Sequence, residues 1–215
     1  GNCRAGSTSE AAGAAGGGGA AGSAAGAVCA CTSEPAFTAL LKRQAGEVHG
    51  LWAADSYMMS HDEWRVMNWC DACQRRKLTP GQIVADSART CTQLLHSAAP
   101  GARVFVWSDM FDPFHNARSN FYLVNGDLKG SWEGLGTDVI VVNWNQGETD
   151  GVRFFANRGN RQLMAGYYDA PVEKTRKWLQ EATLEKGVMG VMYTTWRNNY
   201  GQLEAFSKML DDEGW

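Results

Sequence analysis

Five short apolar runs without polar alternation lie along the chain, separated by longer stretches in which apolar residues recur at helical spacing. A run that is apolar at every position is typical of a strand buried on both faces, and such strands are usually parallel. The alternation of strands and helices therefore predicts an α/β fold with a parallel sheet and helices outside it. The predicted strands are residues 56–60, 104–107, 139–142, 163–167 and 188–193.

Helices are predicted between and around these strands. Thr79 and Gln82 have the spacing of a capping box, in which each side chain accepts a hydrogen bond from the other residue's backbone amide. A helix therefore begins there and ends before Pro100-Gly101. The other predicted helices cover residues 34–53 and 171–186 and the segment that carries Leu203, Phe206 and Leu210.

Two local features are also predicted outside this alternation. Glu173 and Lys177 are spaced for an ion pair one helical turn apart. Residues 121–124, the Asn125-Gly126 dipeptide and the residues after it predict a β-hairpin with a two-residue turn.

The first part of the chain has a different composition. Residues 5–30 are almost entirely Ala, Gly and Ser, which offer too few large apolar side chains to offset the entropy lost on ordering. We therefore predict a disordered, low-complexity Gly/Ala-rich leader over residues 1–33 and one folded domain over residues 34–215.

Composition and charge narrow the classes of function. The 215 residues are 44% hydrophobic, enough for one well-buried domain. The net charge of -3 comes from 20 basic and 23 acidic residues scattered along the chain, so no basic stripe is available for a phosphate backbone. No apolar run approaches the roughly 18 residues of a membrane span. We expect neither a nucleic-acid partner nor a membrane span.

The cysteines give a partial metal-binding pattern. Cys70 and Cys73 have half the ligand spacing of a zinc ribbon, but no second close pair follows them. Structural thiols are favoured, so the sequence predicts no metal ligand and no cofactor. A metal site on a binding module, with Cys70, Cys73 and His61, remains the third-ranked hypothesis. His61 is otherwise expected to be a hydrogen-bonded side chain at a strand end.

All five predicted strands end in polar and aromatic residues. Ligands of parallel α/β folds bind at the carboxyl ends of the strands. Sugar hydroxyls need polar partners, and the C–H face of a sugar ring packs on an aromatic side chain. A single ending is ordinary, but five together predict a carbohydrate site. They are His61-Asp62-Glu63, Trp107-Ser108-Asp109, Asn143-Trp144-Asn145, Tyr167-Tyr168-Asp169 and Thr195-Trp196-Arg197-Asn198.

The order and spacing of these residues resemble the C-terminal five strands of family 20 glycoside hydrolases, the β-N-acetylhexosaminidases. The resemblance covers residues 35–212 and rests on the Asp62-Glu63 pair, the tryptophans that follow it and the Tyr167-x-Asp169 motif. It implies a partial (β/α)8 TIM barrel, about strands 4 to 8. It also implies retaining, substrate-assisted hydrolysis of terminal β-N-acetylhexosamine residues in an oligosaccharide or glycoconjugate.

The resemblance further implies a role for each matching residue. Glu63 would be the general acid, and Asp62 would orient the 2-acetamido group of the substrate, whose carbonyl oxygen is the nucleophile. Substrate-binding roles would fall to Tyr167 at the acetamido oxygen, Asp169 at a hydroxyl, Trp107, Trp144 and Trp196 as pocket walls, and Asp109 and Asn198 at the remaining strand ends.

The chain departs from the family pattern at several positions. Ser60-His61 stands where the family has two glycines before the acidic pair, and Asn198 stands where a Glu follows the last Trp. The Gly/Ala-rich leader cannot supply barrel strands 1 to 3 with their Arg, Asp and His. A segment that completes the barrel is therefore an expected partner. The second-ranked hypothesis is a truncated or degenerate barrel that binds carbohydrate without turnover.

Overall fold

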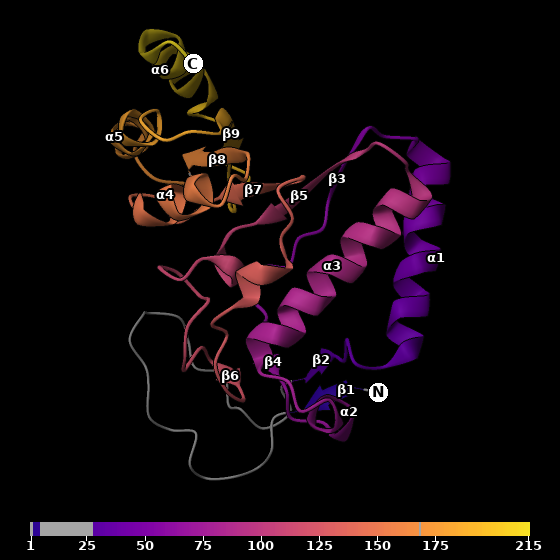
Figure 1. The fold of residues 1–215 in the computed structure, drawn as a ribbon. Coiled ribbons are helices and arrows are strands. Elements are labelled where there is room, and N and C mark those ends of the chain that lie inside the picture. Colours follow the sequence, from indigo (N-terminus) through magenta and orange to yellow (C-terminus); the bar gives the residue numbers. More distant parts are fainter. Residues whose placement is uncertain (1, 5–27, 168) are drawn as a thin grey trace.

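Five parallel strands form the central sheet of the molecule (Figure 1). The structure is a computed structural model and describes residues 2–4, 28–167 and 169–215. The strand order β3-β5-β7-β8-β9 follows the order along the chain, and the sheet is curled into a half-barrel. β7 is buried at every position, as expected for a Val-rich strand covered on both faces. All five predicted strands are present, as β3 (Ser56–Met58), β5 (Arg103–Trp107), β7 (Val139–Asn143), β8 (Gln162–Tyr167) and β9 (Val188–Thr194).

The helices flank this sheet, with α1 and α3 packed together on one side and α4, α5 and α6 near β7, β8 and β9 (Figure 1). The predicted capping box is present at the start of α3. The Gln82 amide donates to Thr79 Oγ1 at 3.2 Å, and the Thr79 amide donates to Gln82 Oε1 at 2.9 Å. The helices are α1 (Pro35–Trp52), α2 (Asp71–Arg75), α3 (Pro80–Ala98), α4 (Asp150–Asn157), α5 (Val172–Ala182) and α6 (Leu203–Glu213).

One predicted ion pair of the helices is wrong. Glu173 pairs with Arg176, at 2.9 Å, and not with Lys177. Arg176 and Lys177 lie three and four residues after Glu173, so both are on the helix face of Glu173. The Arg176 guanidinium therefore competes with Lys177 for the Glu173 carboxylate. The short helices α2 and α4 were not predicted.

The predicted hairpin is wrong. β6 (Leu123–Val124) pairs in parallel with β4 (Val66–Met67), and the antiparallel contact is a single bridge between Ser119 and Asp127. The turn residue Asn125 is held by β4 instead. Its side-chain amide donates to the Asn68 carbonyl at 2.9 Å, and the Asn68 amide donates back to the Asn125 carbonyl at 3.0 Å. These bonds between distant residues override the local turn preference.

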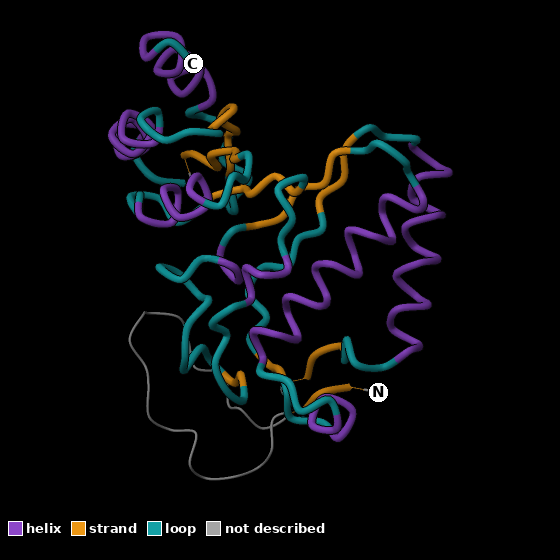
Figure 2. The backbone as a smooth tube through the Cα atoms, in the orientation of Figure 1, coloured by secondary structure: helices purple, strands orange, loops and turns teal. Residues whose placement is uncertain are grey.

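The segment between β5 and β7 is long and mostly loop (Figure 2), with the 3-10 helices η1 (Asp109–Phe111) and η2 (Ser131–Gly134). It packs directly on the first turn of α3. A Cβ atom at Gly81 would overlap the backbone carbonyls of Leu128 and Lys129, so only glycine permits this approach. The larger core cluster lies here and includes Ile83, Val106 and Phe111, and the smaller one joins β8 to α5 and α6.

A two-stranded antiparallel ribbon, β1 (Asn2–Arg4) and β2 (Val28–Ala30), precedes α1. Just after it, Cys31 is buried and belongs to the larger core cluster. Residues 5–27 of the predicted leader lie outside the described residues, so the predicted boundary between leader and domain stays a prediction. None of the helices in the described ranges combines the length and apolarity needed to cross a bilayer.

Candidate active site

A cavity of about 150 Å³ lies at the carboxyl ends of the strands. Asp62 and Glu63 come from the loop after β3, whereas the aromatic walls come from β5 and from the ends of β7 and β9. Five of the nine predicted site residues line this cavity, namely Asp62, Glu63, Trp107, Trp144 and Trp196. Residues up to 134 positions apart in sequence thus meet at one point because parallel strands end at the same edge.

The backbone before and within the acidic pair is left-handed. Ser60, His61 and Glu63 have φ values of 60°, 63° and 46°. Glycine adopts this region without steric cost, whereas other residues lose about 1 kcal/mol or more. Ser60 and His61 therefore follow the backbone path that a pair of glycines would take, and the surrounding contacts must hold them in it.

His61 is one of these anchors. It is buried, its Nδ1 lies 3.0 Å from the Met59 carbonyl oxygen and its Nε2 lies 3.3 Å from Ser87 Oγ. Its ring stacks on Trp64 at a centroid distance of 5.1 Å. The expectation of a hydrogen-bonded strand-end histidine is confirmed. Burial lowers the pKa of His61 and so favours the neutral ring.

Asp109 lies behind the cavity and not on its surface. Its carboxylate is fully buried and accepts hydrogen bonds from the Glu63 amide and Asn116 Nδ2, both at 2.9 Å, and from Trp144 Nε1 at 3.1 Å. Burial raises its pKa to about 6 despite these bonds. Asp109 thus fixes one catalytic candidate and one aromatic wall, whereas the sequence analysis assigned it to the substrate.

Glu63 also has a cationic neighbour. Arg65 Nη2 donates to Glu63 Oε2 at 2.6 Å in a solvent-accessible ion pair. The Arg65 guanidinium in turn lies 4.9 Å from the centre of the Tyr122 ring. Sequence reasoning did not identify Arg65.

Asp169 shapes the loop that carries Trp196. Its carboxylate accepts hydrogen bonds from Thr195 Oγ1 at 2.6 Å and from the Trp196 and Arg197 amides at 2.6 and 3.2 Å. The Thr195 hydroxyl contributes most to the lowered pKa of Asp169. Trp196 is 60% exposed and forms the rim of the cavity.

Tyr167 and Asn198 are not among the residues that line the cavity. The Tyr167 ring is buried and stacks on Tyr193 at 4.4 Å, and its hydroxyl accepts a hydrogen bond from Asn199 Nδ2 at 3.0 Å. Asn198 is exposed on the loop after β9 and has a φ of 53°. Both residues lie beside the cavity, at the strand ends that border it.

Comparison with known proteins supports the fold. No family model matches the chain, and no curated protein matches it. Among solved structures, the chain is similar to an inactive mutant of a GH20 exo-β-N-acetylglucosaminidase from Vibrio harveyi, with 14% identity and a TM-score of 0.53. The match covers 83% of this chain and 30% of that one.

The likeness is one of fold. This chain spans about 30% of the length of that protein, and its five-stranded half-barrel is consistent with part of a barrel. The comparison therefore supports a half-barrel of parallel strands and helices as the fold of this chain.

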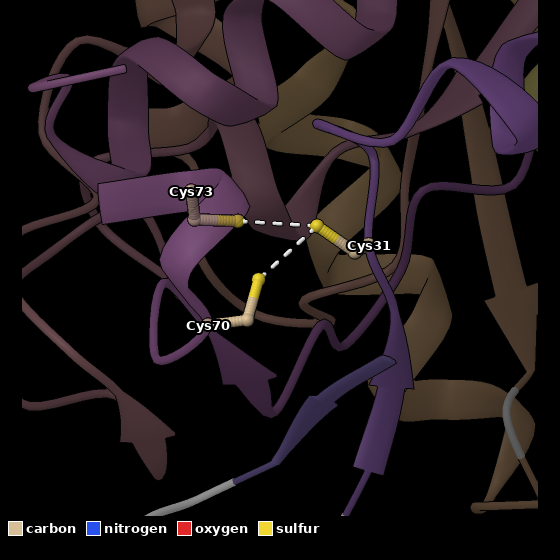
Figure 3. Close-up of side chains that lie close together, drawn as sticks. All are labelled: Cys31, Cys70 and Cys73. Carbon is tan, nitrogen blue, oxygen red and sulfur yellow. Dashed lines mark hydrogen bonds between the residues drawn. The ribbon is translucent and has the colours of Figure 1, made fainter. Parts of the chain in front are cut away.

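The residues that could hold a metal, drawn in Figure 3, are not among those that line this cavity. Cys31, Cys70 and Cys73 place their sulfur atoms within 4.8 Å of one another. His61 is not in this group, because it bonds to Met59 and Ser87. A zinc-ribbon pattern has a second close cysteine pair, so the sequence did not point to Cys31, a single residue 39 positions before Cys70.

Proposed function

We propose that this chain carries the catalytic end of a retaining glycoside hydrolase that acts on terminal β-N-acetylhexosamine residues. The observation that carries the proposal is the single cavity in which an Asp-Glu pair faces three tryptophans. Polar groups for hydroxyls and flat apolar faces for a sugar ring are the requirements of a carbohydrate site. The similarity of the fold to part of a GH20 enzyme adds support.

In the first step, Glu63 gives its proton to the glycosidic oxygen as the bond to the anomeric carbon breaks. The acetamido carbonyl oxygen of the substrate forms the new bond to that carbon, so the nucleophile belongs to the substrate. Asp62 orients the acetamido group and balances the positive charge that develops on it.

In the second step, water attacks the anomeric carbon, the bond between that carbon and the acetamido oxygen breaks, and Glu63 takes up the proton of that water. The configuration is retained because two inversions occur at the same carbon. Asp109 keeps the Glu63 backbone in place through its bond to the Glu63 amide.

The test compares two sugars and two leaving groups. The full chain should hydrolyse nitrophenyl N-acetyl-β-glucosaminide much faster than nitrophenyl β-glucoside, which lacks the acetamido nucleophile. Glu63→Gln should reduce turnover by about 10²–10⁴-fold. The loss should be larger for an alkyl glycoside, since a poor leaving group depends more on protonation.

A matched control is available in Glu133. It is exposed and pairs with Arg158 at 3.2 Å, as Glu63 pairs with Arg65, but it lies outside the cavity. Glu133→Gln should leave turnover unchanged. Equal rates on the two sugars, or full activity in Glu63→Gln, would overturn the mechanism.

Carbohydrate binding without turnover is the second candidate. It is favoured by the sheet, which has five strands in the described ranges where a closed barrel has eight. Calorimetric binding of N-acetylglucosamine by a chain that hydrolyses neither glycoside would select this function. Trp144→Ala should then weaken binding, since it removes an aromatic wall.

A further inference from the structure

We propose that Cys31, Cys70 and Cys73 are ligands of a structural zinc ion that fastens the segment after β2 to the half-barrel. The site lies apart from the catalytic cavity, and its existence does not depend on the glycosidase function. Its three sulfur atoms come from two parts of the chain that are about 40 residues apart.

The distances fit a shared metal better than a disulfide. Cys31 Sγ lies 3.2 Å from Cys70 Sγ and 3.5 Å from Cys73 Sγ, and all three sulfur atoms lie within 4.8 Å of one another (Figure 3). A disulfide requires about 2.05 Å. Zinc–sulfur bonds of about 2.3 Å in a tetrahedron place neighbouring sulfurs about 3.8 Å apart. One ion can therefore contact all three after small side-chain shifts.

Local structure explains why the sulfurs converge. Cys70 directly precedes α2 and Cys73 lies within it, so the C-x-x-C spacing places both residues on one side of a single helical turn. Cys31 approaches from the opposite direction, just after β2. Two sulfurs from a helix start and one from a separate strand are a usual ligand arrangement for structural zinc.

The surroundings suit a thiolate site. Cys31 and Cys73 are buried in the larger core cluster, and Ser33 Oγ donates a hydrogen bond to Cys73 Sγ at 3.3 Å. Arg76 Nη1 donates to the same Ser33 oxygen at 3.4 Å. Outer hydrogen bonds of this kind hold ligands in place. The Arg76 cation also offsets the net negative charge of one zinc with three thiolates.

The β1–β2 ribbon offers the fourth ligand that a closed zinc site needs. Cys29 lies two residues before Cys31 and packs against the same core cluster. In the strand register, the Cα atom of Cys29 is paired with that of Cys3. A fourth thiolate from this pair would give zinc four sulfur ligands.

The metal would also support a second cavity. This cavity, of about 360 Å³, is lined by the β2 segment on one side and by Glu63, Trp64 and Arg65 on another. Cys29 and Cys73 both belong to its lining. Zinc would therefore hold in place a wall that faces the catalytic candidate Glu63.

Metal analysis of the full chain, purified with reductant and without a histidine tag, tests the site. We expect one zinc per chain. Cys31→Ser and Cys73→Ser should lose most of it, and so should Cys70→Ser. Cys91→Ser is the matched control, because Cys91 is a half-buried thiol in α3 outside the group. Cys29→Ser and Cys3→Ser identify the fourth ligand.

A second measurement needs no variant and so holds even if the serine variants fail to fold. Cobalt added to the metal-free chain should give a sulfur-to-cobalt charge-transfer band and the visible bands of a tetrahedral ion, and zinc should remove both. Zinc should also raise the melting temperature, since it binds the folded chain preferentially. Absence of zinc and of the cobalt bands would overturn the proposal. A disulfide among these cysteines found by mass spectrometry, or bound iron with sulfide, would also overturn it.

Discussion

Asp109 and Asp169 lie at the ends of two strands of one sheet, and each accepts three hydrogen bonds, yet their pKa values shift in opposite directions. Asp109 is fully buried, and its pKa rises to about 6. Asp169 is half-buried, and its pKa falls. The number of hydrogen bonds therefore does not decide the direction of the pKa shift. Removal from water outweighs the bonds at Asp109, whereas the bonds prevail at Asp169.

The two carboxylates also hold different parts of the site. Asp109 bonds to the Glu63 amide and the Trp144 indole, which form the floor and one wall of the cavity. Asp169 bonds to the loop that carries the rim residue Trp196. We expect the part of the site held by Asp109 to govern the chemical step and the part held by Asp169 to govern binding.

Asp109→Asn should have the largest effect. All three partners of Asp109 donate protons, with Glu63 and Asn116 on one carboxylate oxygen and Trp144 on the other. The asparagine oxygen can therefore serve only one side, and its NH2 group faces a donor on the other. Glu63 and Trp144 should move, and turnover of the N-acetylglucosaminide should fall about 100-fold. Asp127→Asn is the control, since Asp127 accepts bonds from Ser119 and Lys129 away from the cavity. Unchanged turnover in Asp109→Asn would show that Asp109 does not position Glu63.

Asp112→Asn tests whether burial can set the direction in which a carboxyl pKa shifts. Asp112 is buried, and its pKa is raised to about 7, chiefly by burial. Between pH 8 and pH 5 the folded chain binds a proton here, whereas the unfolded chain, with a carboxyl pKa of about 3.9, does not. The stability of the native chain relative to the variant should therefore rise by roughly 2 kcal/mol as the pH falls over this range.

The measurement is urea unfolding of both proteins across this pH range. The difference between them is the relevant quantity, because His61 and His115 have lowered pKa values and act in the opposite direction below about pH 6.5. Their contributions cancel between the two proteins. A difference that does not change with pH would show that Asp112 titrates normally in the fold.

Asp169→Asn should affect binding more than turnover. The loop after β9 loses a charged acceptor, so the rim residue Trp196 should become less ordered, and KM should rise about 10-fold with kcat within about twofold. The pKa of Asp169 is lower in the folded chain than in the unfolded chain. The Asp169 carboxylate therefore stabilises the fold at pH values above its unfolded pKa, and this stabilisation is lost as the pH falls through its folded pKa. A fall in kcat as large as that expected for Asp109→Asn would contradict the separate roles of Asp109 in turnover and Asp169 in binding.

Ser60→Gly should have the smallest effect. Ser60 has a φ of 60°, which glycine adopts freely, so the substitution should stabilise the fold by about 0.5 kcal/mol. Ser56→Gly is the opposite control, because Ser56 lies in the extended strand β3, where glycine is unfavourable. Thermal unfolding of both variants checks these expectations, since the melting temperature should rise in Ser60→Gly and fall in Ser56→Gly. Destabilisation by Ser60→Gly would mean that its side-chain contacts outweigh the backbone strain.

The half-barrel could be predicted because its signals are local. The run at residues 139–143 has no polar alternation, and the structure buries all of it. Parallel strands end at one edge, so strand-end residues such as Trp107 and Trp144 were expected to converge, and both line the cavity. The support that Asp109 gives Glu63 was not foreseeable, since it depends on the loop after β3 turning back toward η1.

Features that depend on contacts between distant segments were missed. The Asn68–Asn125 bonds that pair β4 with β6 join residues 57 positions apart and leave no periodic pattern. Cys31 is a single residue whose partners become visible only when the chain folds. The left-handed conformation of Ser60 and His61 was not predicted, because residues other than glycine adopt it uncommonly.

The strand order of the sheet has a consequence for how the chain folds. Each strand of the half-barrel pairs with the strand that precedes it in the sheet, so its partner has already been synthesised when it leaves the ribosome. The last two pairings, β7 with β8 and β8 with β9, each close a segment that contains one helix, α4 or α5, which keeps the entropy cost of these steps low. The sheet can therefore assemble from β3 to β9 in the direction of translation, with β9 as the last edge added.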